Sequence, residues 1–175
     1  MTKRLFVAAT RQNDGKTMTA LGLYHALNQY YTSCGYIKPV GQSYRIVDGH
    51  KIDKDAVLFS KVYPIKDALP EMSPIAIPAG FTEDFIENGN PKELQDSIKT
   101  CFNKISKNKE FVLIEGTGHA GVGNVIGVSN ATVADLLESS VILVCLGGIG
   151  RSIDEIMLNK ASFDQMGVTV SGVIV

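Results

Sequence analysis

Residues 9–17 read ATRQNDGKT, and they lie between an apolar, strand-like run and a helix-like segment. The stretch ends as the phosphate-binding pattern G-x-x-x-x-G-K-[ST] does, but Thr10 stands where that pattern has its first glycine. In such loops, backbone N–H groups at a helix N-terminus face phosphate oxygens. Lys16 can then reach the β- and γ-phosphates, and Thr17 can offer its hydroxyl to magnesium. The alternative interpretation is a helix start that carries an exposed lysine.

Short apolar runs alternate with helix-like segments along the rest of the chain. The expected strands are residues 5–9, 35–40, 111–114, 141–146 and 171–175. The expected helices are residues 16–31, 53–62, a helix beginning at Pro91, residues 131–138 and residues 152–166. Most of the apolar runs do not alternate with polar residues, which suits parallel strands buried on both faces. The pattern predicts an α/β fold, a doubly wound and mainly parallel sheet with helices on both faces.

Two segments interrupt this alternation. Residues 64–80 contain Pro64, Pro70, Pro74 and Pro78, which predicts an irregular excursion. Residues 116–127 read GTGHAGVGNVIG, a glycine-rich loop of the kind that closes on a ligand.

Composition narrows the class of protein. The 175 residues carry a net charge of −1, so no overall field attracts nucleic acid or an anionic membrane. The apolar runs are too short to span a bilayer, and the three cysteines form no CxxC motif. We therefore expect a cytoplasmic protein with reduced thiols. We also expect one domain over residues 1–175 that lacks its C-terminal end, because Val175 lies inside a core strand.

Several short motifs in order resemble dethiobiotin synthetase and cobyrinic acid a,c-diamide synthase. Ala9 and Thr10 stand where the loops of these enzymes have glycine and threonine, when one more residue is allowed in the loop. The other matching stretches are Gly35–Val40 (GYIKPV), Asp55-Ala56, Glu115–Gly118 (EGTG), Thr132–Leu136, Val141–Val144 and Gly172–Val175. The resemblance spans the chain and implies a P-loop NTPase that uses ATP and Mg²⁺.

The resemblance also implies roles for individual residues. The phosphate-binding residues would be Asn13, Asp14, Gly15, Lys16, Thr17 and Met18. The ligands of Mg²⁺, direct or through water, would be Thr17, Asp55 and Glu115. The residues acting on the reacting phosphoryl group would be Lys16, Lys38 and Glu115.

The residues themselves give independent support. Lys16 and Glu115 follow apolar strands, and open α/β sheets bind ligands at the carboxyl ends of their strands. Glu115 comes directly after four apolar residues, where a carboxylate is costly to bury without a cation. Other interpretations remain open: Glu115 and Lys38 could turn into solvent, and Asp53 could take the role given to Asp55.

A further set of residues is assigned to substrate or to a switch. Arg11 lies five residues before Lys16, the spacing of a second lysine in partition-type ATPases, and could reach phosphate in its own or a partner subunit. The alternative interpretation is a loop arginine whose side chain is solvated and has no functional role. The remaining candidates are Gln42, Ser43, Gly116, Thr117, Gly118 and His119.

The expected function is an ATP-dependent ligase that activates a carboxylate or carbamate by phosphoryl transfer. The residues after Val40 differ from those that meet substrate in dethiobiotin synthetase, so a different small carboxylate-type substrate is expected. A homodimer is expected, with no nucleic acid and no membrane as partner. The alternatives are a nucleotide-sensing regulatory domain of a longer protein, or a dimerising, partition-like ATPase switch.

Overall fold

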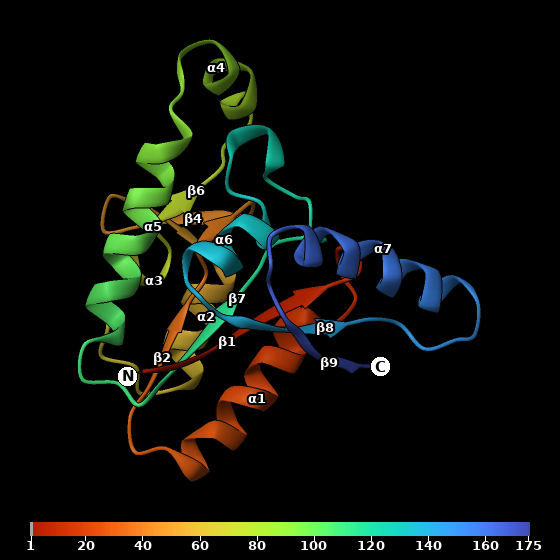
Figure 1. The fold of residues 1–175 in the computed structure, drawn as a ribbon. Coiled ribbons are helices and arrows are strands. Elements are labelled where there is room, and N and C mark those ends of the chain that lie inside the picture. The colour runs from red at the N-terminus through yellow and green to blue at the C-terminus, as the bar shows by residue number, and fades with distance from the viewer. Residues whose placement is uncertain (1) are drawn as a thin grey trace.

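A five-stranded sheet forms the centre of the computed structural model, which describes residues 2–175 (Figure 1). All its pairings are parallel, in the order β2-β7-β1-β8-β9. The strands are β1 (Lys3–Ala9), β2 (Cys34–Ile37), β7 (Phe111–Glu115), β8 (Ser140–Val144) and β9 (Val170–Ile174). This confirms the predicted α/β fold and makes β1 and β7, which end near the two groups of site residues, direct neighbours.

Helices cover both faces of the sheet. They are α1 (Lys16–Tyr30), α2 (Lys54–Val62), α3 (Leu69–Met72), α4 (Phe81–Asn88), α5 (Pro91–Ser106), α6 (Asn130–Leu136) and α7 (Arg151–Gln165), with a 3-10 turn η1 (Asn124–Ile126). Figure 1 shows α1 on one side of the sheet and α6 and α7 on the other. The four helices predicted over the same parts of the chain as α1, α2, α6 and α7 start and end within about one to two residues of the predictions, which is the usual uncertainty of helix ends.

The core follows from the uniformly apolar strands. Every residue of β7 is buried, and so are the last four of β1. The ring of Tyr36 on β2 stacks on Phe59 of α2, with centroids 3.6 Å apart and planes 13° apart. β9 alternates between half-buried and exposed residues because it is the edge strand of the sheet.

The predicted strand over residues 35–40 is shorter than expected and is split. β2 ends at Ile37, and the Lys38 amide donates to the carbonyl of Met72 at 2.8 Å. Pro39 has no N–H to continue the ladder, so the chain leaves the main sheet there. It then forms β3 (Val40–Gly41), which pairs with β6 (Ile75–Ala76) in a separate small sheet. Lys38 therefore sits at the point where the chain leaves the main sheet.

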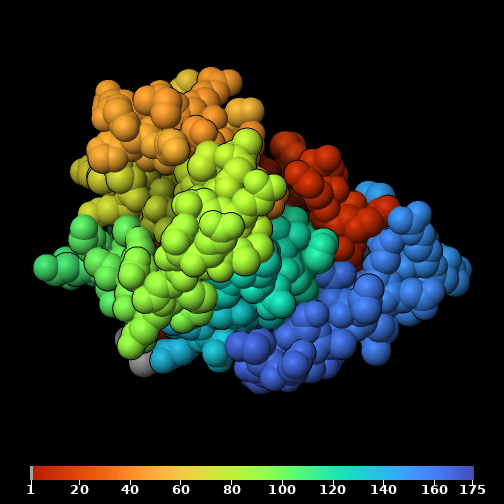
Figure 2. All heavy atoms as spheres, turned by 90° about the horizontal axis from the view of Figure 1, so that it is seen from above, coloured from red at the N-terminus to blue at the C-terminus, as the bar shows by residue number. Residues whose placement is uncertain are grey.

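Five elements named below, two strands of a hairpin, one further strand and two helices, were not predicted. A hairpin of β4 (Tyr44–Val47) and β5 (His50–Asp53) turns at Asp48-Gly49, both with positive φ, the turn chemistry that favours two-residue hairpins. The segment 64–80, expected to be irregular, contains α3 and β6, and α4 follows it. Figure 2 looks onto the face where this hairpin, α4 and the glycine-rich loop come together.

Candidate functional site

The loop from β1 to α1 has the backbone of an anion site. Asn13 and Gly15 have φ of 69° and 86°, a left-handed conformation that these two residue types adopt most readily. Helix α1 begins at Lys16 and has no side-chain cap, so its first-turn N–H groups lack intrahelical acceptors. Together with the positive end of the helix dipole, these groups favour a bound anion.

Thr10, which replaces the first glycine of the pattern, braces this loop. Its hydroxyl donates to Asp14 Oδ2 at 2.9 Å, and its amide donates to the carbonyl of Val144 at 2.9 Å. The Asp14 side chain is buried and accepts this hydrogen bond. It is not among the residues that line the cavity beside the loop, which is described below. The loop keeps its shape by a side-chain contact that a glycine could not make.

Lys16 reaches across the loop to the glycine-rich segment. Its Nζ donates to the carbonyl of Gly118 at 3.5 Å, and the residue is buried. Burial and the neighbouring charge of Lys38 lower the pKa of Lys16 to about 8. A phosphate group would offer this ammonium a stronger acceptor than one carbonyl oxygen.

Glu115 is the centre of a buried polar cluster at the end of β7. Its Oε1 accepts from Thr17 Oγ1 and from Lys38 Nζ, each at 2.9 Å, and its Oε2 accepts from the Tyr36 hydroxyl at 2.9 Å. Lys38 also binds Asp55 Oδ2 at 2.7 Å. The structure thus places Thr17, Lys38, Asp55 and Glu115 together, and neither Lys38 nor Glu115 turns into solvent. Tyr36 is a member that sequence reasoning missed, because a tyrosine in an apolar run looks like core.

The two candidate aspartates have different places. Asp53 caps α2 by accepting from the Asp55 amide at 2.9 Å, and it lies so close to Gly41 that a Cβ there would fall 2.4 Å from Asp53 Oδ2. Asp55, two residues on, faces Lys38 instead. Asp53 thus orients the start of α2, while the Asp55 carboxylate joins the cluster.

Burial and charge pairing compete within this cluster. Burial raises the pKa of Glu115, and the nearby Lys38 ammonium only partly offsets this. Burial alone would lower the pKa of Lys38, but the carboxylates of Glu115 and Asp55 outweigh burial and raise it. The pKa of Asp55 is lowered, because Lys38 outweighs the effect of its own burial. Lys38 is therefore a cation held by two carboxylates.

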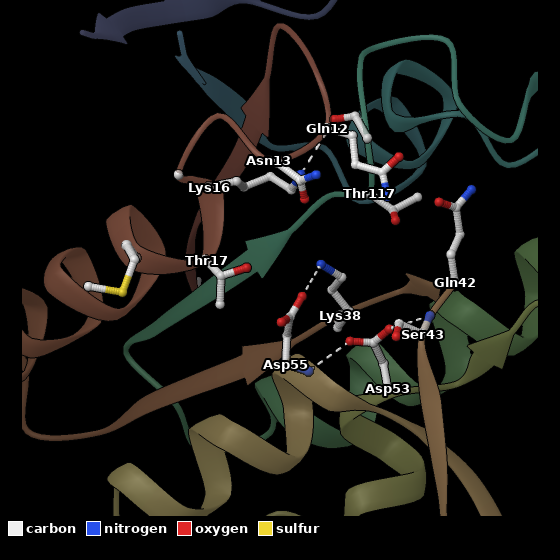
Figure 3. A pocket seen from close by; sticks show the side chains of 13 residues that line it. Gln12, Asn13, Lys16, Thr17, Lys38, Gln42, Ser43, Asp53, Asp55 and Thr117 are labelled. Atoms are coloured by element: carbon white, nitrogen blue, oxygen red, sulfur yellow. Dashed lines mark hydrogen bonds and ion pairs between the residues drawn. The ribbon is translucent and has the colours of Figure 1, made fainter. Parts of the chain in front are cut away.

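A cavity of about 430 Å³ opens above these residues. Figure 3 shows the side chains around it, with Lys16 and Thr17 on one side and Lys38, Asp55 and Asp53 on the other. Its lining residues come from the loop, from the end of β2, from the hairpin region and from the glycine-rich loop; they are Gln12, Asn13, Gly15, Lys16, Thr17, Met18, Lys38, Gln42, Ser43, Asp53, Asp55, Thr117 and Gly118. The volume lies within the range of small-molecule pockets.

Two buried asparagines, which sequence reasoning missed, shape the glycine-rich loop. Asn130 accepts from the Thr117 amide at 2.9 Å and donates to the carbonyls of Thr117 and His119 at 2.7 and 2.8 Å. Asn159 of α7 accepts from the Ala120 amide at 2.8 Å and donates to the Thr10 carbonyl at 3.2 Å. Asn159 therefore joins the phosphate-side loop to the glycine-rich loop. Neither asparagine belongs to a motif, so only the fold reveals them.

Gly116 is placed where only glycine fits. A Cβ at this position would lie 2.6 Å from the Phe6 ring and 2.7 Å from Asn130 Oδ1. The chain can therefore leave β7 and turn directly toward Asn130.

Arg11 and His119 lie outside the cavity. The Arg11 side chain points to α7, with Nε 3.1 Å from Glu155 Oε2 and 3.7 Å from Asp14 Oδ1. His119 is exposed, and its Nδ1 accepts from the Gly121 amide at 3.2 Å. Both residues line a different cavity, against α7. Neither residue lines the cavity that Lys16, Thr17 and Lys38 line.

The donor set fits a magnesium ion. Among residues 2–175 no group of three or more His, Cys, Asp or Glu side chains is arranged to hold a metal. The cluster instead offers one hydroxyl, of Thr17, and two carboxylates, of Asp55 and Glu115, which leaves room for the water and phosphate oxygens that Mg²⁺ retains. Both oxygens of Glu115 already accept hydrogen bonds, which favours contact through water.

None of the helices within residues 2–175 has the length and apolar character needed to cross a membrane.

Known proteins share this architecture. The kinase domain of the Escherichia coli tyrosine kinase ETK superposes with a TM-score of 0.61 at 16% identity, covering 99% of this chain and 66% of that one. A putative plasmid partition protein from Borrelia burgdorferi, solved with AMPPNP, gives a TM-score of 0.56 at 12% identity, covering 100% of this chain and 74% of that one. At these identities the likeness establishes the fold alone.

Sequence relatives extend over the whole chain. The ATP-dependent dethiobiotin synthetase BioD of Clostridium kluyveri is 25% identical over 182 residues, which cover 100% of this chain and 74% of that protein. A phosphate acetyltransferase of Deinococcus radiodurans is 29% identical over 144 residues, 81% of this chain but 19% of that protein. The AAA domain family AAA_26 matches residues 3–175. The chain therefore belongs to the AAA_26 family. It is a P-loop ATPase, and the whole of this chain is distantly homologous to BioD.

Proposed function

We propose that this protein binds Mg-ATP in the 430 Å³ cavity and transfers the γ-phosphoryl group to a carboxylate or carbamate. One observation carries the proposal: a buried lysine, Lys38, is held by two carboxylates directly across the cavity from Lys16. Two cations on either side of one space suit a phosphoryl group in transfer, which spreads charge over its oxygens. The relative named an ATP-dependent dethiobiotin synthetase supports a reaction of this class.

The proposed chemistry has two steps. An oxygen of the carboxylate or carbamate attacks the γ-phosphorus, the bond from that phosphorus to the β–γ bridging oxygen breaks, and ADP leaves. An amine then attacks the carbonyl carbon of the acyl phosphate, loses its proton and expels inorganic phosphate, so that a C–N bond forms. Catalysis is mainly positioning and charge neutralisation, as in other phosphoryl transfers.

Each residue of the cluster has a proposed part. The N–H groups of the loop and Lys16 hold the β- and γ-phosphates. Lys38 binds the attacking oxygen and an oxygen of the transferring group, and its position is fixed by Asp55 and Glu115. Thr17, Asp55 and Glu115 hold Mg²⁺, which when bound neutralises charge on the phosphates.

Calorimetric titration of ATP, with and without Mg²⁺, tests the nucleotide site. The wild-type protein should bind in a magnesium-dependent way, and Lys16→Ala should remove the binding while leaving the circular dichroism spectrum unchanged. The matched control is Lys61→Ala, which replaces an exposed lysine of α2. Equal affinity of Lys16→Ala and wild type would overturn the assignment of this cavity.

Release of ADP in the presence of candidate carboxylates and amines then tests the ligase. ADP release that depends on both co-substrates supports it. ADP release that no carboxylate stimulates would favour the alternative, a nucleotide-sensing domain. Gln42 and Ser43, which differ from the residues that meet substrate in dethiobiotin synthetase, favour this alternative. The proposal includes a homodimer, on the resemblance alone, and sedimentation equilibrium checks it.

A further inference from the structure

A second cavity, of about 640 Å³, lies where β2 begins. This is the opposite end of the sheet from the cavity of about 430 Å³, which we call the nucleotide cavity. We call the second cavity the distal cavity. Its walls are the last turns of α1, the loop into β2, the segment after α2 and Lys109. The residues used below are Tyr24, His25, Asn28, Tyr63, Lys66 and Lys109. None of them lines the nucleotide cavity, and the usual ligand site of an open α/β sheet is at the other edge.

The half-buried ring of Tyr63 gives the distal cavity an apolar face, and the buried ring of Tyr24 lies behind it. The rings of Tyr24 and Tyr63 are 4.7 Å apart with planes at 54°. Their hydroxyls are already used: Tyr24 donates to the Cys34 carbonyl at 3.1 Å, and Tyr63 donates to the Leu21 carbonyl at 2.7 Å. Tyr63 therefore presents ring surface and not a free hydroxyl, which suits a planar ligand.

The charged groups around the distal cavity leave a surplus of cation. Asp67 is paired with Lys109 at 3.2 Å, and Glu110 accepts from both the amide and the hydroxyl of Thr32, at 2.6 and 3.0 Å. Lys66 has no carboxylate within ion-pair distance in residues 2–175, and it stands at the rim with His25. The uncompensated charge at the rim favours a ligand with one acidic group.

We propose that the distal cavity binds a small anion with a flat apolar body, of the class of aromatic carboxylates and sulfonates. The Tyr63 ring takes the planar part and Lys66 takes the acidic group. Asn28 completes the wall from α1, where its amide nitrogen donates to the Tyr24 carbonyl at 2.8 Å.

We further propose that this ligand and the nucleotide influence each other, because three elements connect the two cavities. Helix α1 carries Lys16 at its start and Tyr24 in its third turn. Strand β2 starts at Cys34 and ends just before Lys38. Helix α2 carries Asp55 in its first turn and is followed directly by Tyr63.

Side-chain contacts tie these three elements together. The Tyr63 hydroxyl bonds to the α1 backbone at Leu21, and the Tyr36 and Phe59 rings stack between β2 and α2. On this proposal a shift at one end of the unit displaces groups at the other, and such coupling is reciprocal.

Titration with 8-anilinonaphthalene-1-sulfonate, a fluorescent aromatic anion, tests the site. We expect one probe molecule per chain, still bound in the presence of saturating Mg-ATP, with an affinity changed by about fivefold as the reciprocal coupling requires. Lys66→Glu should weaken binding about tenfold or more. Lys61→Glu makes the same charge change on the exposed face of α2 and should leave the affinity within about twofold.

Two results would overturn the site: equal affinity in Lys66→Glu and wild type, or full displacement of the probe by Mg-ATP that competes for one place. Unchanged circular dichroism spectra exclude unfolding as the cause of a loss. The comparison of Lys66→Glu with wild type is read without nucleotide, so it stands whether or not the proposed ligase function holds.

The coupling is measured by titrating ATP with and without saturating probe. We expect a change in ATP affinity of about fivefold, the lower part of the usual range for coupled sites, and its disappearance in Lys66→Glu. Identical ATP affinity in both titrations would overturn the coupling and leave the distal cavity an independent site.

Discussion

Replacing Lys38 by methionine tests the energetics of the buried cluster. Methionine keeps the length of the side chain and removes the charge, which leaves Glu115, 0% exposed, without its cation. Removing one partner of a buried ion pair costs about 3–5 kcal/mol, a large part of the about 5–15 kcal/mol by which domains are stable. Two hydrogen bonds to Glu115, from Thr17 and Tyr36, remain and place the expected loss at about 3 kcal/mol, the lower end of that range.

The pH dependence of this loss identifies Glu115 as its cause. Without Lys38, burial raises the pKa of Glu115 in the folded protein further above its value in the unfolded chain, about 4.3. The cost is then full above the folded pKa. As the pH falls through that pKa, the folded protein takes up a proton and the cost decreases. It falls by about 1.4 kcal/mol for each pH unit between the two pKa values.

Urea unfolding followed by circular dichroism at pH 8 and pH 5.5 measures both quantities. Lys38→Met should be less stable than wild type by about 3 kcal/mol at pH 8, and the difference should shrink at pH 5.5. Adding Glu115→Gln should recover part of the loss, which a double-mutant cycle reports. Lys61→Met is the surface control. A loss under about 1 kcal/mol at pH 8, or an equal loss at both pH values, would refute the account of the cluster.

Three other predictions concern the nucleotide site. Because the pKa of Lys16 is about 8 in the free protein, ATP binding above pH 8 should take up a proton and weaken as the pH rises. Calorimetry in buffers of different ionisation enthalpy would detect this proton uptake. No proton uptake at pH 9 would contradict the prediction. Glu115→Gln should weaken the Mg²⁺ dependence of ATP binding, seen by titrating Mg²⁺ at fixed ATP; an unchanged dependence would remove Glu115 from the metal. Asn159→Ala leaves the Ala120 amide without its acceptor. It should lower the free energy of unfolding by about 1–3 kcal/mol and weaken ATP binding in the folded protein. A change in the free energy of unfolding under about 0.5 kcal/mol, measured with urea, would contradict the bridging role.

The sequence predicts the parts of this fold that rest on local patterns. Continuous apolar runs predict β1 and β7, because strands buried on both faces need no polar side. The side chains at the ends of those strands then follow, since parallel strands bring their carboxyl ends to one edge. In this way the sequence predicts that Lys16 and Glu115 lie at the same edge of the sheet, and in the structure Thr17, the residue after Lys16, donates to Glu115.

The rest depends on contacts that no local pattern encodes. The roles of Asn130 and Asn159 come from loops that approach them from far along the chain. The hairpin at Asp48-Gly49 carries a local turn signal, but its strands are short and half exposed, so periodicity gave no sign of them. Arg11 has the spacing of a phosphate-reaching residue, yet a partner on α7, Glu155, holds it elsewhere.

The break of the chain at Pro39 separates two tasks in this molecule. Up to Lys38 the chain follows the main sheet, and just beyond it the chain forms strands of two small separate sheets. The cavity-lining residues Gln42 and Ser43 lie between β3 and β4, and Asp53 ends β5. The hairpin can therefore change in length and sequence without disturbing the groups proposed to hold phosphate, as long as Gly41 and Asp53 keep their close fit. On the proposed function, such a division makes the chain a scaffold for retargeting, in which a grafted hairpin would alter the choice of acceptor and leave the proposed phosphate-binding half intact.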